Sequence, residues 1–196
     1  ASKLLVLVQE LTTDGTRWVL SGSMPPGLPS DYYASLLGVI HDAGGKCYLD
    51  ASGVPLMETL SANPDVIRIN REEAEGVLQQ SLEFDRDVVD ALHKMMAFGS
   101  NQVFISDGGK GAWLGIEDGW YRAAAPHVRV RNTVGAGDAM MAALMKAEME
   151  GASAEEMLQF GVAAGSASCE LAGTAAVTME RTMELVEEVS VSGGKY

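Results

Sequence analysis

Apolar and polar residues follow two different periods that alternate along the chain. Short apolar runs have the length of buried strands, whereas segments with an apolar residue every three or four positions have the period of helices that cover a sheet. Because the two signals alternate from end to end, we expect an α/β protein with a mostly parallel sheet. The expected strands are residues 17–21, 46–50, 65–69, 102–106, 112–116, 120–123 and 128–131.

Capping and turn residues mark where the expected elements begin and end. Ser153 and Glu156 have the spacing of a capping box, which predicts the start of a long helix that Gly173 ends. Asp118 and Gly119 lie between two apolar segments, which predicts an antiparallel hairpin. The other helices are expected in the opening segment, from Ser30 to about Asp42, over 54–61, from about Asn70, and over 85–98.

Composition and charge indicate which kinds of partner and which cellular compartment the protein is expected to have. With 196 residues, 47% of them hydrophobic, the chain is expected to form a single domain over residues 1–196. The net charge of −13 argues against nucleic acid and against an anionic membrane surface as partners. No apolar run is long enough to span a membrane and the N-terminus is not signal-like. Cys47 and Cys169 lack CxxC spacing and suit a reducing compartment, so we expect a cytoplasmic protein.

The segment Asn132-Thr-Val-Gly-Ala-Gly-Asp138 precedes a strongly apolar helix signal. Small residues leave the amides of Gly135, Ala136 and Gly137 uncovered, and a helix that starts there adds the positive end of its dipole, which predicts an anion site. Asp138 would place a carboxylate beside that site, and an anion hole next to a base is what phosphoryl transfer to a hydroxyl needs. The simpler alternative is that Asp138 only caps the helix.

Two further loops follow expected strands, and each has a structural and a functional interpretation. Asn70 and Glu73 have capping-box spacing, and their oxygens could also hold a hydrated Mg²⁺. The glycine-rich segment 106–111 could approach a nucleotide's phosphates or could simply form a turn. The chain has neither a Gly-x-x-x-x-Gly-Lys-Ser/Thr motif nor a Gly-x-Gly-x-x-Gly motif, which argues against P-loop hydrolases and simple dinucleotide-binding proteins.

The order of the loops carries more information than any one of them. The motifs are Ser-Gly-Ser-Met-Pro-Pro-Gly at 21–27, Asp-Ala-Ser-Gly at 50–53, Arg-Ile-Asn with Glu73 at 68–73, Ser-Asp-Gly-Gly-Lys-Gly-Ala at 106–112, and the segment 132–138. This succession resembles the ribokinase-like (PfkB) carbohydrate kinases. It is most similar to the branch that contains 1-phosphofructokinase and tagatose-6-phosphate kinase, and the resemblance covers essentially all 196 residues.

The resemblance implies a fold, a reaction and a role for each motif. The fold would be a doubly wound, mostly parallel sheet with helices on both faces. The reaction would be ATP-dependent phosphorylation of a ketohexose phosphate of the fructose 1-phosphate or tagatose 6-phosphate type. The small residues at 161–168 would lie near the adenine, or would only allow close helix packing. Asp138 would be the catalytic base, with an anion hole at Gly135, Ala136 and Gly137, a Mg²⁺ site at Asn70 and Glu73, and a nucleotide loop at Ser106, Asp107, Gly108, Gly109, Lys110 and Gly111.

The sequence also departs from the family pattern. Arg68-Ile69 stands where Lys-Pro is usual, and Ala139 stands where this branch commonly has serine. Family members carry about a third of their chain ahead of the helix that opens this sequence, so we expect the first strands, the β lid and most sugar-phosphate contacts to be lacking. Two interpretations follow: part of a sugar-phosphate kinase, or a truncated, inactive homologue that binds a nucleotide or a partner. In either case an uncovered sheet edge near 17–21 predicts a homodimer.

Overall fold

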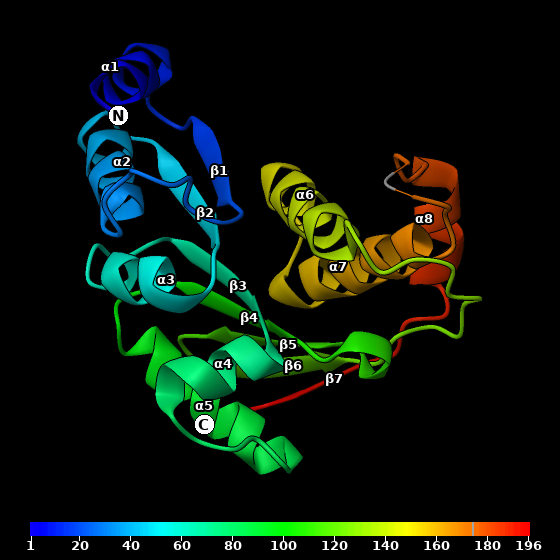
Figure 1. The fold of residues 1–196 in the computed structure, drawn as a ribbon. Helices are drawn as coiled ribbons and strands as arrows, with labels where there is room; N and C mark the ends of the chain where they lie inside the picture. The colour runs from blue at the N-terminus through cyan, green and yellow to red at the C-terminus, as the bar shows by residue number, and fades with distance from the viewer. Residues whose placement is uncertain (174) are drawn as a thin grey trace. The chain divides into compact units, whose positions relative to one another are not determined.

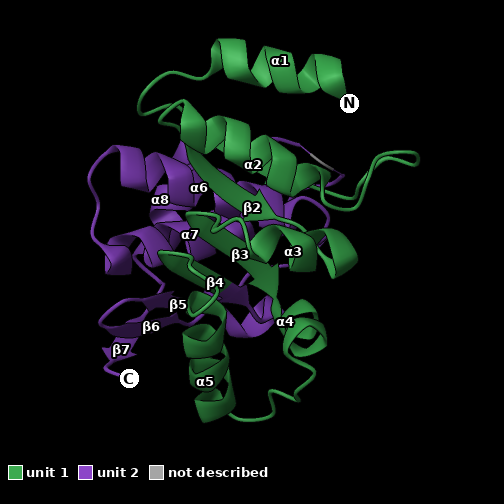
Figure 2. Ribbon diagram, turned by 90° about the vertical axis from the view of Figure 1, so that its left-hand side faces the viewer, with its two compact units in different colours: residues 1–104 green, residues 105–196 purple. Residues whose placement is uncertain are grey.

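The computed structural model describes residues 1–173 and 175–196. These residues form two compact units, Ala1–Phe104 and Ile105–Tyr196, which are coloured separately in Figure 2. The division falls within strand β4 (Gln102–Ser106). No helix in the described ranges is both long and apolar enough to cross a membrane. The alternation of helices and strands along the chain (Figure 1) confirms the α/β class.

Unit 1 contains three parallel strands that all come from expected apolar runs. They are β1 (Arg17–Ser21), β2 (Lys46–Asp50) and β3 (Val66–Asn70), with β2 paired to both neighbours. Residues 47–49 of β2 are completely buried, as expected for a strand covered on both faces. Ser21 lies opposite Asp50 in the β1–β2 register, so the motifs at 21–27 and 50–53 begin at the same edge of this sheet.

The five helices of unit 1 lie close to their expected positions. Ser30 does not cap α2 as predicted: the N-cap residue is Asp31, and the Ser30 hydroxyl donates instead to Glu58 Oε2 at 2.9 Å. Ser30 and Asp31 are both residue types that commonly precede a helix, so the sequence does not distinguish them. The helices are α1 (Ser2–Leu11), α2 (Tyr32–Asp42), α3 (Gly53–Leu60), α4 (Arg71–Leu78) and α5 (Asp85–Met96).

Unit 2 contains the predicted hairpin and a strand that the sequence did not predict. Strands β5 (Ala112–Ile116) and β6 (Gly119–Ala123) are antiparallel, and β7 (Val191–Gly194) pairs antiparallel with β6. The expected strand at 128–131 does not form. Val130 is 59% exposed, and the Arg131 N–H donates to the Cys169 carbonyl at 2.7 Å rather than to a neighbouring strand.

Three helices complete unit 2: α6 (Ala136–Met149), α7 (Ala154–Cys169) and α8 (Met179–Val186). The capping box of Ser153 and Glu156 starts α7, as predicted, with each backbone N–H bonded to the other residue's side chain. The helix ends at Cys169 instead of continuing to Gly173, and the N–H groups of residues 131 and 132 both donate to the Cys169 carbonyl. A tertiary contact therefore supplies the partner for this carbonyl group.

Candidate active site

The glycine turn before α6 has the geometry that its sequence predicts. Gly135 is the N-cap residue of α6 and has φ of +89°, a conformation that glycine adopts without steric cost. The Asn132 side chain braces the turn, since its Oδ1 accepts from the Val134 N–H at 3.1 Å and its Nδ2 donates to the Gly173 carbonyl at 2.8 Å. These two hydrogen bonds tie the turn both to its own backbone and to the segment after α7.

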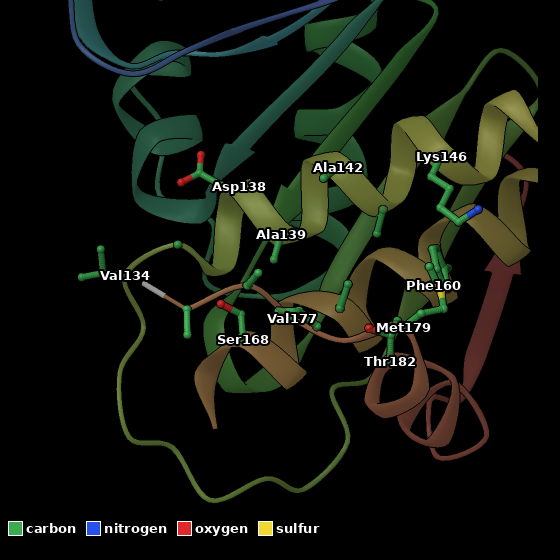
Figure 3. A pocket seen from close by; sticks show the side chains of 15 residues that line it. Val134, Asp138, Ala139, Ala142, Lys146, Phe160, Ser168, Val177, Met179 and Thr182 are labelled. Atoms are coloured by element: carbon green, nitrogen blue, oxygen red, sulfur yellow. The ribbon is translucent and has the colours of Figure 1, made fainter. Parts of the chain in front are cut away.

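Asp138 is not the capping residue of this helix. It is the third residue of α6, in its first turn, and its side chain is exposed. Figure 3 shows the carboxylate directed away from Ser168 and Val177. The simple capping interpretation is thus wrong for this position, while the placement of a carboxylate beside the helix N-terminus is confirmed.

The amides of the turn differ in their partners. The Ala136 N–H donates to the Thr133 carbonyl at a long 3.2 Å. In the described part of the chain, the Gly135 and Gly137 N–H groups have no backbone acceptor outside the helix. Together with the positive end of the α6 dipole, they form the electropositive start of this helix, where an anion is stabilised.

A cavity of about 450 Å³ extends from this turn along one side of α6 (Figure 3). Its walls come from α6, α7, α8 and the segment between α7 and α8, so it lies entirely within unit 2. Most of the lining is apolar, which suits a flat aromatic ligand. The lining residues are Val134, Gly135, Asp138, Ala139, Ala142, Ala143, Lys146, Phe160, Ala164, Ser168, Ala175, Ala176, Val177, Met179 and Thr182.

The small-residue stretch at 161–168 provides the close helix packing that its sequence suggested as one alternative. A Cβ at Gly161 would come within 2.7 Å of Leu144 Cδ2, and one at Gly165 within 3.3 Å of the Ala136 carbonyl oxygen. These two glycines let α7 pack closely against α6. Ala164 and Ser168, on the adjoining side of the same helix, line the cavity.

The loop at 106–111 forms a tight turn that contains a short 3-10 helix, η1 (Gly108–Lys110). The Asp107 N–H donates to the Gly111 carbonyl at 2.8 Å, and Lys110 Nζ lies 3.6 Å from Asp107 Oδ2. Gly108 and Gly109 are exposed, with open space where a Cβ would be. None of the six residues of this loop lines the cavity.

Asn70 and Glu73 form the predicted capping box at the start of α4, in unit 1. Asn70 Oδ1 accepts from the Glu73 N–H and Glu73 Oε2 accepts from the Asn70 N–H, both at 2.8 Å. The box leaves Glu73 a second carboxylate oxygen, which fits a magnesium ion bound through its water shell. Among the described residues, no cluster of three His, Cys, Asp or Glu side chains could hold a metal directly.

The two thiols are not candidate nucleophiles. Burial, with a smaller contribution from Asp65, raises the pKa of Cys47 to about 12. Burial also raises the pKa of Cys169 above its usual value. Because the thiolate is the reactive form, both side chains are inert at neutral pH.

Several residues of the cavity were not singled out by the sequence. Lys146 lies eight residues after Asp138, a little over two turns further along α6, so its nearness in the sequence could have suggested it. Phe160, Met179 and Thr182 could not have been found in this way, because α7 and α8 bring them to α6 only through tertiary packing.

The family model for pfkB family carbohydrate kinases matches residues 2–181, which includes every motif described above. The chain belongs to this family. The match extends over unit 1 and most of unit 2, so it covers the glycine turn, the capping box at Asn70 and the loop at 106–111.

Known proteins agree with this membership. The chain is 33% identical over 179 residues to the ATP-dependent 6-phosphofructokinase isozyme 2 of Escherichia coli K12, an alignment that covers 90% of this chain and 58% of that protein. The structure of Escherichia coli phosphofructokinase-2 in complex with substrates and products superimposes with a TM-score of 0.89, at 32% identity, over 95% of this chain and 61% of that one. The tetrameric inhibited form of that enzyme gives 0.86, at 31% identity, with 95% and 60% covered. The expected ribokinase-like fold is thereby confirmed.

Proposed function

We propose that this chain supplies the nucleotide-binding and catalytic part of an ATP-dependent kinase that phosphorylates a ketohexose phosphate. The observation that carries the proposal is the α6 N-terminus, where Asp138 stands one residue after the uncovered Gly137 amide at one end of a nucleotide-sized cavity. Family membership and the relatives' names support the same reaction class. The two free thiols, Cys47 and Cys169, support a cytoplasmic location.

The chemistry follows from the arrangement at the start of α6. Asp138 would take the proton from the sugar hydroxyl as the hydroxyl oxygen attacks the γ-phosphorus, and the bond to the bridging oxygen of ADP would break. The Gly135 and Gly137 amides would face the negative charge that develops on the transferred group. Mg²⁺, when bound, neutralises charge on the phosphates, and Glu73 with Asn70 would hold it through water.

The proposed acceptor is fructose 1-phosphate or tagatose 6-phosphate, from the motifs at 21–27 and 50–53. The Escherichia coli relative is a 6-phosphofructokinase, so fructose 6-phosphate belongs in the same panel. Release of ADP with each sugar phosphate in turn would identify the acceptor. A chain that binds nucleotide but releases ADP with none of them would support the alternative, a nucleotide-binding or interaction module.

We expect weak Mg·ATP binding by the chain, and we expect Gly137→Val to suppress it. The isopropyl group would block the approach of phosphate to the turn's amides. Calorimetry at millimolar ATP with Mg²⁺ measures both proteins, and Gly38→Val is the matched control because it lies in α2 with open space around its Cβ position. If Gly137→Val and the parent chain give equal heats of binding, the turn is not part of the nucleotide site.

We also propose that the chain forms a homodimer. Supporting observations are the α1 side chains Leu4, Leu7 and Leu11, which are 46%, 48% and 58% exposed. Such a patch is uncommon on a stable monomer. Light scattering at micromolar concentration should give twice the mass of one chain, and Leu7→Glu with Leu11→Glu should halve it. Val54→Glu on α3, also 58% exposed, is the control, and a monomeric parent chain would refute the dimer.

A further inference from the structure

The segment that joins α7 to α8 forms one wall of the cavity. Ala175, Ala176 and Val177 line the cavity from this segment, and the view of Figure 3 shows Val177 between Ser168 of α7 and Met179 of α8. Ala175 and Ala176 are exposed and Val177 is half-buried, and none of the three lies in a helix or strand. The position of this wall therefore depends on contacts made by the residues on either side of it.

The first part of the segment is attached to the glycine turn before α6. The Cys169 carbonyl accepts from the Arg131 and Asn132 N–H groups at 2.7 and 3.2 Å. The Gly173 carbonyl accepts from Asn132 Nδ2 at 2.8 Å. These bonds hold residues 169 and 173, but they do not reach residues 175–177 further along the segment.

An ion pair joins the two ends of the segment to each other. Arg181, in the first turn of α8, donates to both carboxylate oxygens of Glu170, the C-cap residue of α7. Nε lies 2.7 Å from Oε2 and Nη2 lies 3.0 Å from Oε1. The hydrogen bond from Arg181 lowers the pKa of Glu170, and the charge of Arg131 adds to this effect. A contact through two parallel hydrogen bonds fixes the orientation of the partners as well as their distance.

Both partners stand at a helix end that disfavours their charge. A cation in the first turn of α8 and an anion at the end of α7 each oppose the dipole of their own helix. Arg181 has a second carboxylate partner, Glu184 Oε2 at 2.7 Å, but that pair stays within α8. The Glu170 side chain is 25% exposed and that of Glu184 56%. The contact between helices, rather than the stability of either helix, therefore accounts for the charges at positions 170 and 181.

We propose that Arg181 and Glu170 are positioning residues for nucleotide binding. Their ion pair keeps the two ends of the segment together, so that residues 175–177 stay against the nucleoside part of the ligand. Neither side chain lines the cavity, so the pair acts through the wall and not by touching the nucleotide. This inference rests on the proposed function, which places the phosphates at the start of α6 and leaves the rest of the cavity to the nucleoside.

The test compares a ligand that has a nucleoside with one that has none. Calorimetry measures the affinities for Mg·ATP and for Mg·tripolyphosphate. Glu170→Gln should weaken Mg·ATP binding by on the order of fivefold and leave Mg·tripolyphosphate binding unchanged, because only ATP reaches residues 175–177. Glu184→Gln is the matched control: it removes the other carboxylate partner of Arg181 and should change neither affinity.

A double-mutant cycle shows whether the two residues act as a pair. Arg181→Met should weaken Mg·ATP binding as much as Glu170→Gln does, and the double variant should lose no more than either single variant. Additive losses would show that the residues act separately and would contradict the inference. So would an equal loss of both ligands in a folded Glu170→Gln, because the effect would then lie at the phosphate end.

The parent chain distinguishes the inference from the proposed function. If it binds Mg·ATP and Glu170→Gln binds Mg·ATP equally well, the inference fails and the proposed function stands. If it binds Mg·ATP no more tightly than Mg·tripolyphosphate, the wall at 175–177 contributes nothing and only the inference is refuted. If it binds neither ligand, the proposed function fails together with the inference.

Discussion

Asp138→Asn is expected to lower phosphoryl transfer by on the order of a hundred- to ten-thousand-fold in any preparation in which the chain supports turnover. The substitution removes the proposed base but keeps the size of the side chain and the neighbouring amides of the turn. Gly135 rather than Asp138 is the N-cap residue of α6, so the substitution leaves the start of the helix unchanged. ATP affinity should therefore stay nearly unchanged.

Steady-state rates and calorimetry on the same samples separate the two effects. Asp118→Asn, in the exposed turn of the β5–β6 hairpin, is a control for loss of one carboxylate elsewhere in unit 2. Near-normal turnover in Asp138→Asn would show that Asp138 is not the catalytic base. A matching loss of ATP affinity would instead assign it to nucleotide binding.

Gly111→Ala is expected to reduce the free energy of unfolding by about 3 kcal/mol or more. Gly111 has φ of +103° and ψ of −138°, a region that residues with a Cβ rarely occupy. An added Cβ would overlap the Ala123 carbonyl oxygen and lie 2.8 Å from the Ala125 nitrogen, both of them backbone atoms that cannot move aside cheaply. Gly111 is thus fixed by packing at the junction of the loop and β5, whatever the loop binds.

Two neighbouring glycines provide matched controls for urea-induced unfolding of these variants. Gly109→Ala meets open space without positive φ and should be close to neutral. Gly108→Ala meets open space but has φ of +52°, so it should show only the smaller cost of backbone strain. If Gly111→Ala lowered the free energy of unfolding no more than Gly108→Ala does, the close approach of the Ala123 carbonyl would not contribute to the cost.

Local physics let the sequence predict much of unit 1 and the beginnings of the site helices. A run such as 46–50 buries its middle three residues, and that burial requires apolar side chains that are visible in the sequence. The capping boxes at Asn70 with Glu73 and at Ser153 with Glu156 join residues three apart, so spacing alone determines them. The glycine turn is equally local, since Gly135 adopts its positive φ within one residue of α6.

Tertiary structure determined the elements that depend on hydrogen bonds between residues far apart in the sequence. Strand β7 has one apolar residue, Val191, and forms through backbone pairing with β6, whereas the alternating segment at 128–131 finds no strand partner. Helix α7 ends where residues 131 and 132 bond to its last carbonyl. Most of all, the cavity exists because Gly161 and Gly165 let α7 approach α6 while α8 closes the side with Met179 and Thr182. The sequence alone determined which groups could do the chemistry, because their motifs are local. The folded chain determined the space beside them, because that space is bounded by residues that meet only on packing.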